Sequence, residues 1–191
     1  TNKLLDLLKQ QPQIVNTAFI NNLTCCLPFE MGRVTITGAD LLQLHCGDVL
    51  LPDVNYLIND ELCVKLHQLV LHFSFKDAVA TYLGYSIIRE QNQGVNMSEE
   101  NNGVAEGSSV AAEQNLQESI NHDDLQFEVA FEVDRQLMSF ADLTALKRGS
   151  VLNLNCSPKS PVSLKVNGRI VGSGRLVQLG DQLGVQITEI K

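Results

Sequence analysis

An internal repeat on either side of a polar stretch most constrains what this chain can fold into. "ADLLQLHCGDVLL" (residues 39–51) aligns with "ADLTALKRGSVLN" (residues 141–153), and the two share seven of thirteen positions. Downstream, residues 63–87 align without a gap with residues 163–187, which places Leu83–Gly84 over Leu183–Gly184. Two anchors in the same order predict two copies of one module of about 65 residues.

The stretch between the copies has the composition of a linker. Residues 91–122 are rich in Gln, Asn, Glu, Ser and Gly and contain no aromatic residue. Such a segment cannot bury enough apolar surface to offset its ordering entropy, so we expect a flexible acidic linker. The predicted modules then span residues 25–90 and 123–191. In residues 1–24 apolar side chains recur at helical spacing, which predicts a helical segment, expected to be the tail of a missing upstream domain.

The second copy has the patterns of a small β module. "FEVAFEV" (residues 127–133) alternates apolar and polar side chains as a half-buried strand does, and Ser139 is placed to cap a short helix after it. Asn167–Gly168 between alternating apolar residues predicts a tight hairpin turn. The first copy has His67–Gln68 at that position, which predicts a looser hairpin.

A module of this size has a thin core and exposed strand edges. Small sheets usually cover such edges by pairing with another copy. A linker of about 30 residues reaches on the order of 30 Å, which suffices for the two copies to dock side by side. The predicted fold class is therefore mainly β, with two tandem modules paired as a pseudo-dimer.

Charge and composition exclude several classes of function. The net charge is −8 and the basic residues are scattered, which argues against nucleic acid and against anionic membranes as partners. No apolar run approaches the roughly 20 residues of a membrane span. The five cysteines are odd in number and irregularly spaced, as suits a reducing compartment. These features predict a soluble, acidic, cytoplasmic protein without direct membrane insertion.

No pattern of residues indicates catalysis, a cofactor or a metal. The glycine-rich run "VNGRIVGSGRLVQLG" (residues 166–180) lacks the order of a phosphate-binding loop and sits among strand patterns. Cys63, His67 and His72 do not have metal-ligand spacing, and an unbroken strand would point the two histidines to opposite faces. There is no G-x-S-x-G motif, and Asp40 and Asp142 fit a role at helix starts. We therefore expect no enzyme activity, no metal and no cofactor.

Four apolar or amide residues in a row are the candidate binding surface. Leu176, Val177, Gln178 and Leu179 lie on one predicted strand, where alternation can bury only half of them. The aligned residues of the first copy, 76–79, are more polar. The outward-facing side chains are either an inconsequential or dimer-contact surface, or a docking patch present only in the second module.

The sequence "VNGRIVGSGRLVQLGDQLGVQITEI" resembles the signature of the SpoA (surface presentation of antigens) family, with Arg175 where Glu is usual and Gln178 where an aliphatic residue is familiar. "LPFEM" with "ADLLQLHCGDVLL", and "VAFEV" with "ADLTALKRGSVLNL", resemble the first half of that module. The resemblance implies that the two modules intertwine, and we expect Gly172 and Gly174 to relieve crowding where they meet. It also implies a non-enzymatic role. One module per chain is typical of the flagellar switch proteins FliM and FliN. Two in tandem are typical of the sorting-platform protein of type III secretion injectisomes.

This resemblance also implies partners and a location. In the family the stator protein SctL docks on the strand that matches Leu176, Val177 and Gln178. The adaptor SctK is a further expected partner, with the export ATPase and chaperone–effector complexes contacted indirectly, in the bacterial cytoplasm beneath the inner membrane. Met97 is a hypothetical internal start whose product, residues 97–191, would pair with the whole chain. A flagellar switch component remains an alternative, as does a small metal- or ligand-binding β-barrel enzyme.

Overall fold

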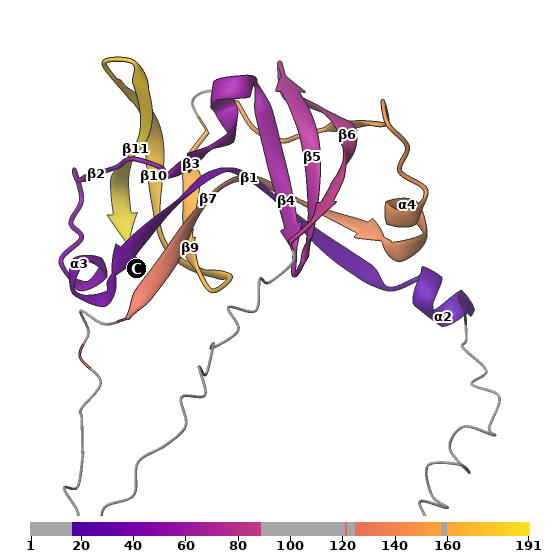
Figure 1. Ribbon diagram of the computed structural model, residues 1–191, viewed down its shortest axis with the longest axis horizontal. Helices are drawn as coiled ribbons and strands as arrows, with labels where there is room; N and C mark the ends of the chain where they lie inside the picture. Colours follow the sequence, from indigo (N-terminus) through magenta and orange to yellow (C-terminus); the bar gives the residue numbers. More distant parts are fainter. Residues whose placement is uncertain (1–16, 89–120, 122–124, 158–159) are drawn as a thin grey trace, which may run out of the picture.

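The computed structural model describes residues 17–88, 121, 125–157 and 160–191. Its strands form one antiparallel sheet, so the mainly β class is confirmed (Figure 1). Residues 1–16, nearly all of the predicted linker and Met97 lie outside the described residues. No helix in the described part combines the length and apolar character that a membrane crossing requires. The elements are α2 (Thr17–Asn21), β1 (Thr24–Thr37), α3 (Gly38–Leu42), β2 (Val49–Leu50), β3 (Val54–Asn55), the 3-10 helix η1 (Tyr56–Asn59), β4 (Glu61–Leu66), β5 (Leu69–Lys76), β6 (Val79–Ile87), β7 (Gln126–Ser139), α4 (Phe140–Thr144), β8 (Val151–Asn153), β9 (Val162–Val166), β10 (Arg169–Leu179) and β11 (Gln182–Ile190).

The two long strands at the centre come from different modules. β1 and β7 pair antiparallel along their whole length, from Thr24 opposite Ser139 to Thr37 opposite Gln126. β7 is twice as long as the strand that alternation alone predicted at residues 127–133. It continues to Ser139 because its second half pairs with the first half of β1. In Figure 1 these two ribbons cross the middle of the molecule together.

Each module adds a strand to the other. The sheet runs β2-β11-β10-β9-β7-β1-β4-β5-β6-β8. The first module's β2 therefore lies at the edge of the second module's hairpin, and the second module's β8 lies at the edge of the first module's β6. The modules are intertwined, and both hairpin edges that a lone module would expose are partly covered by the exchanged strands.

One apolar core serves both modules. Phe29 and Met31 of β1 are fully buried, as is Phe131 of β7. The ring of Phe29 meets that of Phe73 on β5 edge-on, with the ring centroids 5.1 Å apart. Since the largest core side chains come from strands of both modules, neither module encloses its core without the other.

In the first part of the repeat, residues 39–51 and 141–153, equivalent positions in the structure keep the spacing of 102 residues. Thr37 caps α3 by accepting from the Asp40 N–H, and Ser139 caps α4 by accepting from the Asp142 N–H, so the expected cap is confirmed. Each capping hydroxyl also contacts the carboxylate of the same aspartate, at 2.8 Å for Asp40 and 2.6 Å for Asp142. The repeated aspartates therefore stabilise helix starts.

The second part of the repeat does not follow the gap-free alignment. β4 pairs Val64 with Leu71, whereas β9 pairs Leu164 with Gly172, because a bulge in β10 accommodates one extra residue near Val171. From there on, residues of β10 correspond to residues 101 positions earlier. Leu176 therefore matches Phe75 rather than Lys76.

The hairpin of the second module is also longer. The first module's hairpin ends with Lys76 opposite Val79, and the second module's ends with Leu179 opposite Gln182. Val177, the counterpart of Lys76, already lies opposite Gly184, so two further residue pairs extend the second hairpin. Gln178 and Leu179 have no counterpart in the first module. The predicted overlay of Leu83–Gly84 on Leu183–Gly184 is wrong for this reason.

The turn between β4 and β5 of the first module is as tight as the turn between β9 and β10 of the second module. Asn167 and Gly168 both take positive φ, 50° and 77°, and join β9 to β10. His67 takes a φ of 55°, and Leu66 pairs directly with Leu69. The prediction of a looser first hairpin was wrong, because strand pairing holds His67 in a conformation that usually favours Asn or Gly.

Candidate partner-binding surface

The four predicted binding residues lie on opposite faces of β10. Leu176 is paired with Val185, which is fully buried, so Leu176 and Gln178 point toward the core side. Val177 and Leu179 share the opposite, outer face. Leu179 is 49% exposed and Val177 is half-buried. The row of four thus alternates between the two faces, and Gln178, which shares the face of Leu176, is itself exposed.

Leu176 lines an apolar hollow between the two modules. The hollow has a volume of about 310 Å³, and its wall includes Phe75, Val133, Cys156 and Val162. Phe75 is the counterpart of Leu176 in the first module, so the two matching side chains meet at one cavity. Leu176 therefore contributes to joining the modules, which makes it a poor choice for a surface mutation.

The outward residues continue into an apolar surface built from both modules. β2 of the first module pairs with β11, and its Val49 and the following Leu51 approach Gly184, which lies opposite Val177. A Cβ placed on Gly184 would lie 3.0 Å from Leu51 Cδ2 and 3.0 Å from Val49 Cγ1. The missing side chain lets Leu51 and Val49 pack closely over Gly184. We call Val49, Leu51, Val177 and Leu179 the outer patch.

A polar contact borders the outer patch. Arg175, two residues before Val177 and on the same face, donates from Nε and Nη2 to Gln186 Oε1 at 3.0 and 2.8 Å. Gln186 Nε2 in turn donates to the Gly47 carbonyl. This link ties the first module's loop before β2 to the second module's hairpin. It holds the two halves of the outer patch in place.

The matching surface on the other side of the pseudo-dimer differs in character. β8 pairs with β6 as β2 pairs with β11, so Val151 corresponds to Val49 and Asn153 to Leu51. The counterpart of Val177 is the exposed Lys76, and the counterpart of Gly184 is Val79. Two polar residues, Lys76 and Asn153, therefore replace apolar ones beside the exposed Val151, a side chain stands in place of Gly184, and the extension bearing Leu179 is absent. The outer patch occurs once in the pseudo-dimer.

The two glycines of β10 are required within one hairpin, not between modules. A Cβ on Gly172 would lie 2.5 Å from the Glu189 carbonyl oxygen, and one on Gly174 would lie 2.6 Å from that of Gln186. Both oxygens belong to β11, the neighbouring strand of the same module. The expectation that Gly172 and Gly174 relieve crowding between the modules is corrected accordingly.

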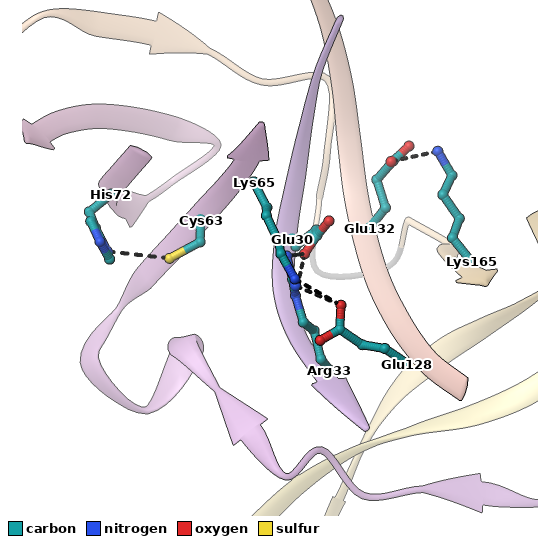
Figure 2. A network of polar contacts seen from close by, with 8 residues as sticks. All are labelled: Glu30, Arg33, Cys63, Lys65, His72, Glu128, Glu132 and Lys165. Carbon is teal, nitrogen blue, oxygen red and sulfur yellow. Dashed lines mark hydrogen bonds and ion pairs between the residues drawn. The ribbon is translucent and has the colours of Figure 1, made fainter. Parts of the chain in front are cut away.

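A cluster of charges fills the other face of the central strands (Figure 2). A polar hollow of about 660 Å³ is lined by residues of both modules. Glu30 accepts from Arg33 Nε at 2.7 Å, and Glu132 accepts from Lys165 Nζ at 2.5 Å and from Arg135 Nε at 3.2 Å. Sequence reasoning missed this cluster, although its signal is present as the repeat "FEMGR" and "FEVDR" at a spacing of 102.

Burial dominates the electrostatics of Glu30. Its side chain is almost removed from water, and this desolvation raises the pKa of its carboxyl above the usual value despite the attraction of Arg33. No buried side-chain nitrogen or oxygen among the described residues lacks a hydrogen-bond partner. The buried polar atoms of the cluster are thus all hydrogen-bonded.

Cys63 and His72 meet across neighbouring strands. Cys63 Sγ lies 3.4 Å from His72 Nδ1, and His72 Nε2 lies 2.9 Å from Ser86 Oγ. His67 belongs to the turn, so the histidines do not share a strand as sequence reasoning assumed. Burial, followed by the charge of Glu61, raises the pKa of the Cys63 thiol to about 11, so it is not an activated nucleophile. Among the described residues no three His, Cys, Asp or Glu side chains gather in a way that could hold a metal ion.

Comparison with known proteins identifies the second module. Residues 122–191 match the family described as "Type III flagellar switch regulator (C-ring) FliN C-term". These residues are a FliN C-terminal, SpoA-type domain. The β7–β11 half of the fold is thereby assigned to the family that the glycine-rich signature resembled.

The relatives are members of the SctQ/FliN family. The Yop proteins translocation protein Q of Yersinia pseudotuberculosis is 41% identical over 66 residues, which are 35% of this chain and 22% of that protein. The surface presentation of antigens protein SpaO of Shigella flexneri is 26% identical over 180 residues, 94% of this chain and 54% of that protein. The flagellar motor switch protein FliN of Borreliella burgdorferi is 31% identical over 67 residues, 35% of this chain and 59% of that protein. The chain thus spans between about a fifth and three fifths of the length of these relatives.

Proposed function

We propose that this chain is a non-enzymatic scaffold component of the C-ring-like sorting platform of a bacterial type III secretion system. It pairs through its two SpoA modules and docks the stator protein SctL, with SctK as a second partner. The export ATPase and chaperone–effector complexes are reached indirectly. The platform lies in the bacterial cytoplasm at the inner membrane. The match of the second module and the alignment with SpaO across both modules support this function.

The observation that carries the docking proposal is the single occurrence of the outer patch. Leu51 and Leu179 expose 41% and 49% of their surface and come from different modules. A partner that covers both of them contacts the intertwined pair and not either module by itself. Docking at this place makes stator recruitment conditional on correct pairing of the modules.

Leu179→Asp tests the docking site. The residue lies at the tip of the extended hairpin, where a charge is compatible with the fold. Ile170→Asp is the matched control, since Ile170 is 45% exposed on the same strand at its opposite end. We expect Leu179→Asp to lose co-purification with SctL while Ile170→Asp retains it, both with native-like circular dichroism. Full retention by Leu179→Asp would contradict this site.

Gly184→Ala provides an independent test. The added methyl group would lie 3.0 Å from side-chain atoms of Leu51 and Val49 and 3.1 Å from the Leu50 carbonyl oxygen, so these groups must move away from Gly184 by a few tenths of an ångström, which changes the shape of the outer patch. We expect weaker SctL binding with little change in the urea midpoint of unfolding. Leu176 is unsuitable for such a test, because Leu176→Asp would place a charge in the apolar hollow and destabilise the pair.

A flagellar switch component is the second candidate, supported by the similarity of the second module to FliN. The alignment with SpaO extends over both modules, which favours the secretion platform. Deleting the chain in its host separates the two: loss of protein secretion with intact motility supports the platform, and the reverse supports the switch.

For a metal-binding β-barrel enzyme, the remaining alternative, stoichiometric zinc in the purified chain would be the decisive sign. The product that starts at Met97 is tested by Met97→Ala, which should abolish a short C-terminal band on an immunoblot.

A further inference from the structure

One carboxylate makes the ion pairs that cross between the modules in the described part of the chain. Glu128 Oε1 of β7 accepts from Arg33 Nη1 at 2.7 Å and from Lys65 Nζ at 3.2 Å, both in the first module (Figure 2). The other ion pairs of the cluster stay within a module. Arg33 binds Glu30, and Arg135 and Lys165 bind Glu132.

The counterpart of Glu128 in the first module is not an acid. Glu128 lies opposite Thr35 in the β1–β7 register, and Cys26 lies opposite Leu137, so Cys26 takes the corresponding place. The remaining members of the cluster are repeated: Glu30 with Glu132, Arg33 with Arg135, and Lys65 with Lys165. The cross-module carboxylate is therefore carried by the second module alone.

This difference decides how nearly each pairing of modules can balance its charges. The first module brings two cations, Arg33 and Lys65, and one carboxylate, Glu30, to the polar hollow. Two first modules would leave Arg33 and Lys65 facing Cys26 on both sides. Four cations would then share two carboxylates instead of the three of the mixed pair, and Arg33 is only 7% exposed, although the Lys65 side chain is 32% exposed. Unbalanced charges are costly in such surroundings.

We propose that Glu128 selects the partner of the first module. Its carboxylate is the acceptor for Arg33 Nη1 and for Lys65 Nζ, so the first module pairs with a second module and not with another first module. The first module thus recognises a SpoA module that carries an acid at the position of Glu128, opposite Thr35.

Charge reversal in the full chain tests the proposal. Glu128→Lys places a third cation beside Arg33 and Lys65, and Lys65→Glu places a carboxylate beside Glu128. Each single variant should unfold at a lower urea concentration than the parent chain. The double variant Glu128→Lys/Lys65→Glu should recover at least half of the loss in midpoint. Glu61→Lys is the matched control, since Glu61 is a half-buried strand acid with no ion pair among the described residues, and Lys65→Glu should not rescue it.

Mixing the two single variants tests selection directly. In the mixture the first module carrying Lys65→Glu meets the second module carrying Glu128→Lys, and the two unmodified surfaces meet as in the parent chain. We expect an equimolar mixture to form a species of twice the chain mass by sedimentation, beyond what either variant forms alone. Two outcomes would overturn the proposal: a double variant that is no more stable than Glu128→Lys, or a mixture in which sedimentation shows no more of the species of twice the chain mass than either variant forms alone. The outer patch is unchanged in these variants, so their outcome is separate from that of the SctL test.

Discussion

Glu30 of β1 lies directly opposite Glu132 of β7, which places two carboxylates face to face where the modules cross. Like charges in this relationship repel. The repulsion is offset on each side by the arginine three residues later in the same strand, Arg33 or Arg135. Lys165 adds a second cation on the side of Glu132. The centre of the pseudo-dimer is therefore held by compensated charges on one face and by the apolar core on the other.

The two equivalent lysines should differ in their contribution to stability. Lys165 and Glu132 are 5% and 7% exposed at the side chain, whereas Lys65 and Glu128 are 32% and 51% exposed. Removing one member of a buried pair costs about 3 kcal/mol or more, and an exposed pair contributes about 0–1 kcal/mol. Lys165→Met should therefore lower the free energy of unfolding far more than Lys65→Met. Urea titration followed by circular dichroism measures both, and equal losses would contradict the assignment.

Glu30 should make stability depend on pH in a defined direction. Burial raises the pKa of its carboxyl in the folded chain above the value of 4.5 that it has when unfolded. The folded state then holds this proton more tightly than the unfolded state does. The contribution of Glu30 to stability therefore falls as the pH rises from the unfolded-state pKa through the higher folded-state pKa. Relative to Glu30→Gln, the parent chain should gain stability as the pH is lowered from 7 to 4.5. Urea midpoints of both proteins at the two pH values give the difference; a loss on acidification would refute it.

Much of this fold could be predicted from the sequence. The repeat, the capped helices and the Asn167–Gly168 turn depend on local patterns, which a sequence displays. The extended hairpin could not be predicted, because a bulge near Val171 and two extra residue pairs shift the register in a way that identity between short strands does not reveal. The outer patch could not be predicted either, because Val49 and Leu51 join Val177 only through the exchange of β2 between modules. Glu128 was missed because its partners lie 63 and 95 residues away in the chain.

The turn between β5 and β6 is a site where a substitution should stabilise the chain. Asp77 and Ala78 both take positive φ, 51° and 62°, in a two-residue hairpin turn. Alanine in this conformation costs roughly 1–2 kcal/mol, and Asp-Gly is a favoured pair for such a turn. Ala78→Gly should raise the free energy of unfolding by about 0.5–1 kcal/mol, after the extra entropy of glycine in the unfolded chain is offset. Gly168→Ala is the converse control and should destabilise, since Gly168 has a φ of 77°.

The thiols offer a test of whether Cys63 and His72 form a reactive pair. A histidine that activated Cys63 would lower its pKa, but burial raises the pKa of this thiol to about 11, so at pH 8 roughly one molecule in a thousand carries the thiolate. Cys63 is also fully buried, whereas Cys46 is exposed. Iodoacetamide at pH 8 should therefore alkylate Cys46 in the native chain and reach Cys63 only in urea, as peptide mass mapping would record. Rapid native labelling of Cys63, abolished by His72→Ala, would instead indicate a nucleophilic site and would reopen the enzymatic alternative.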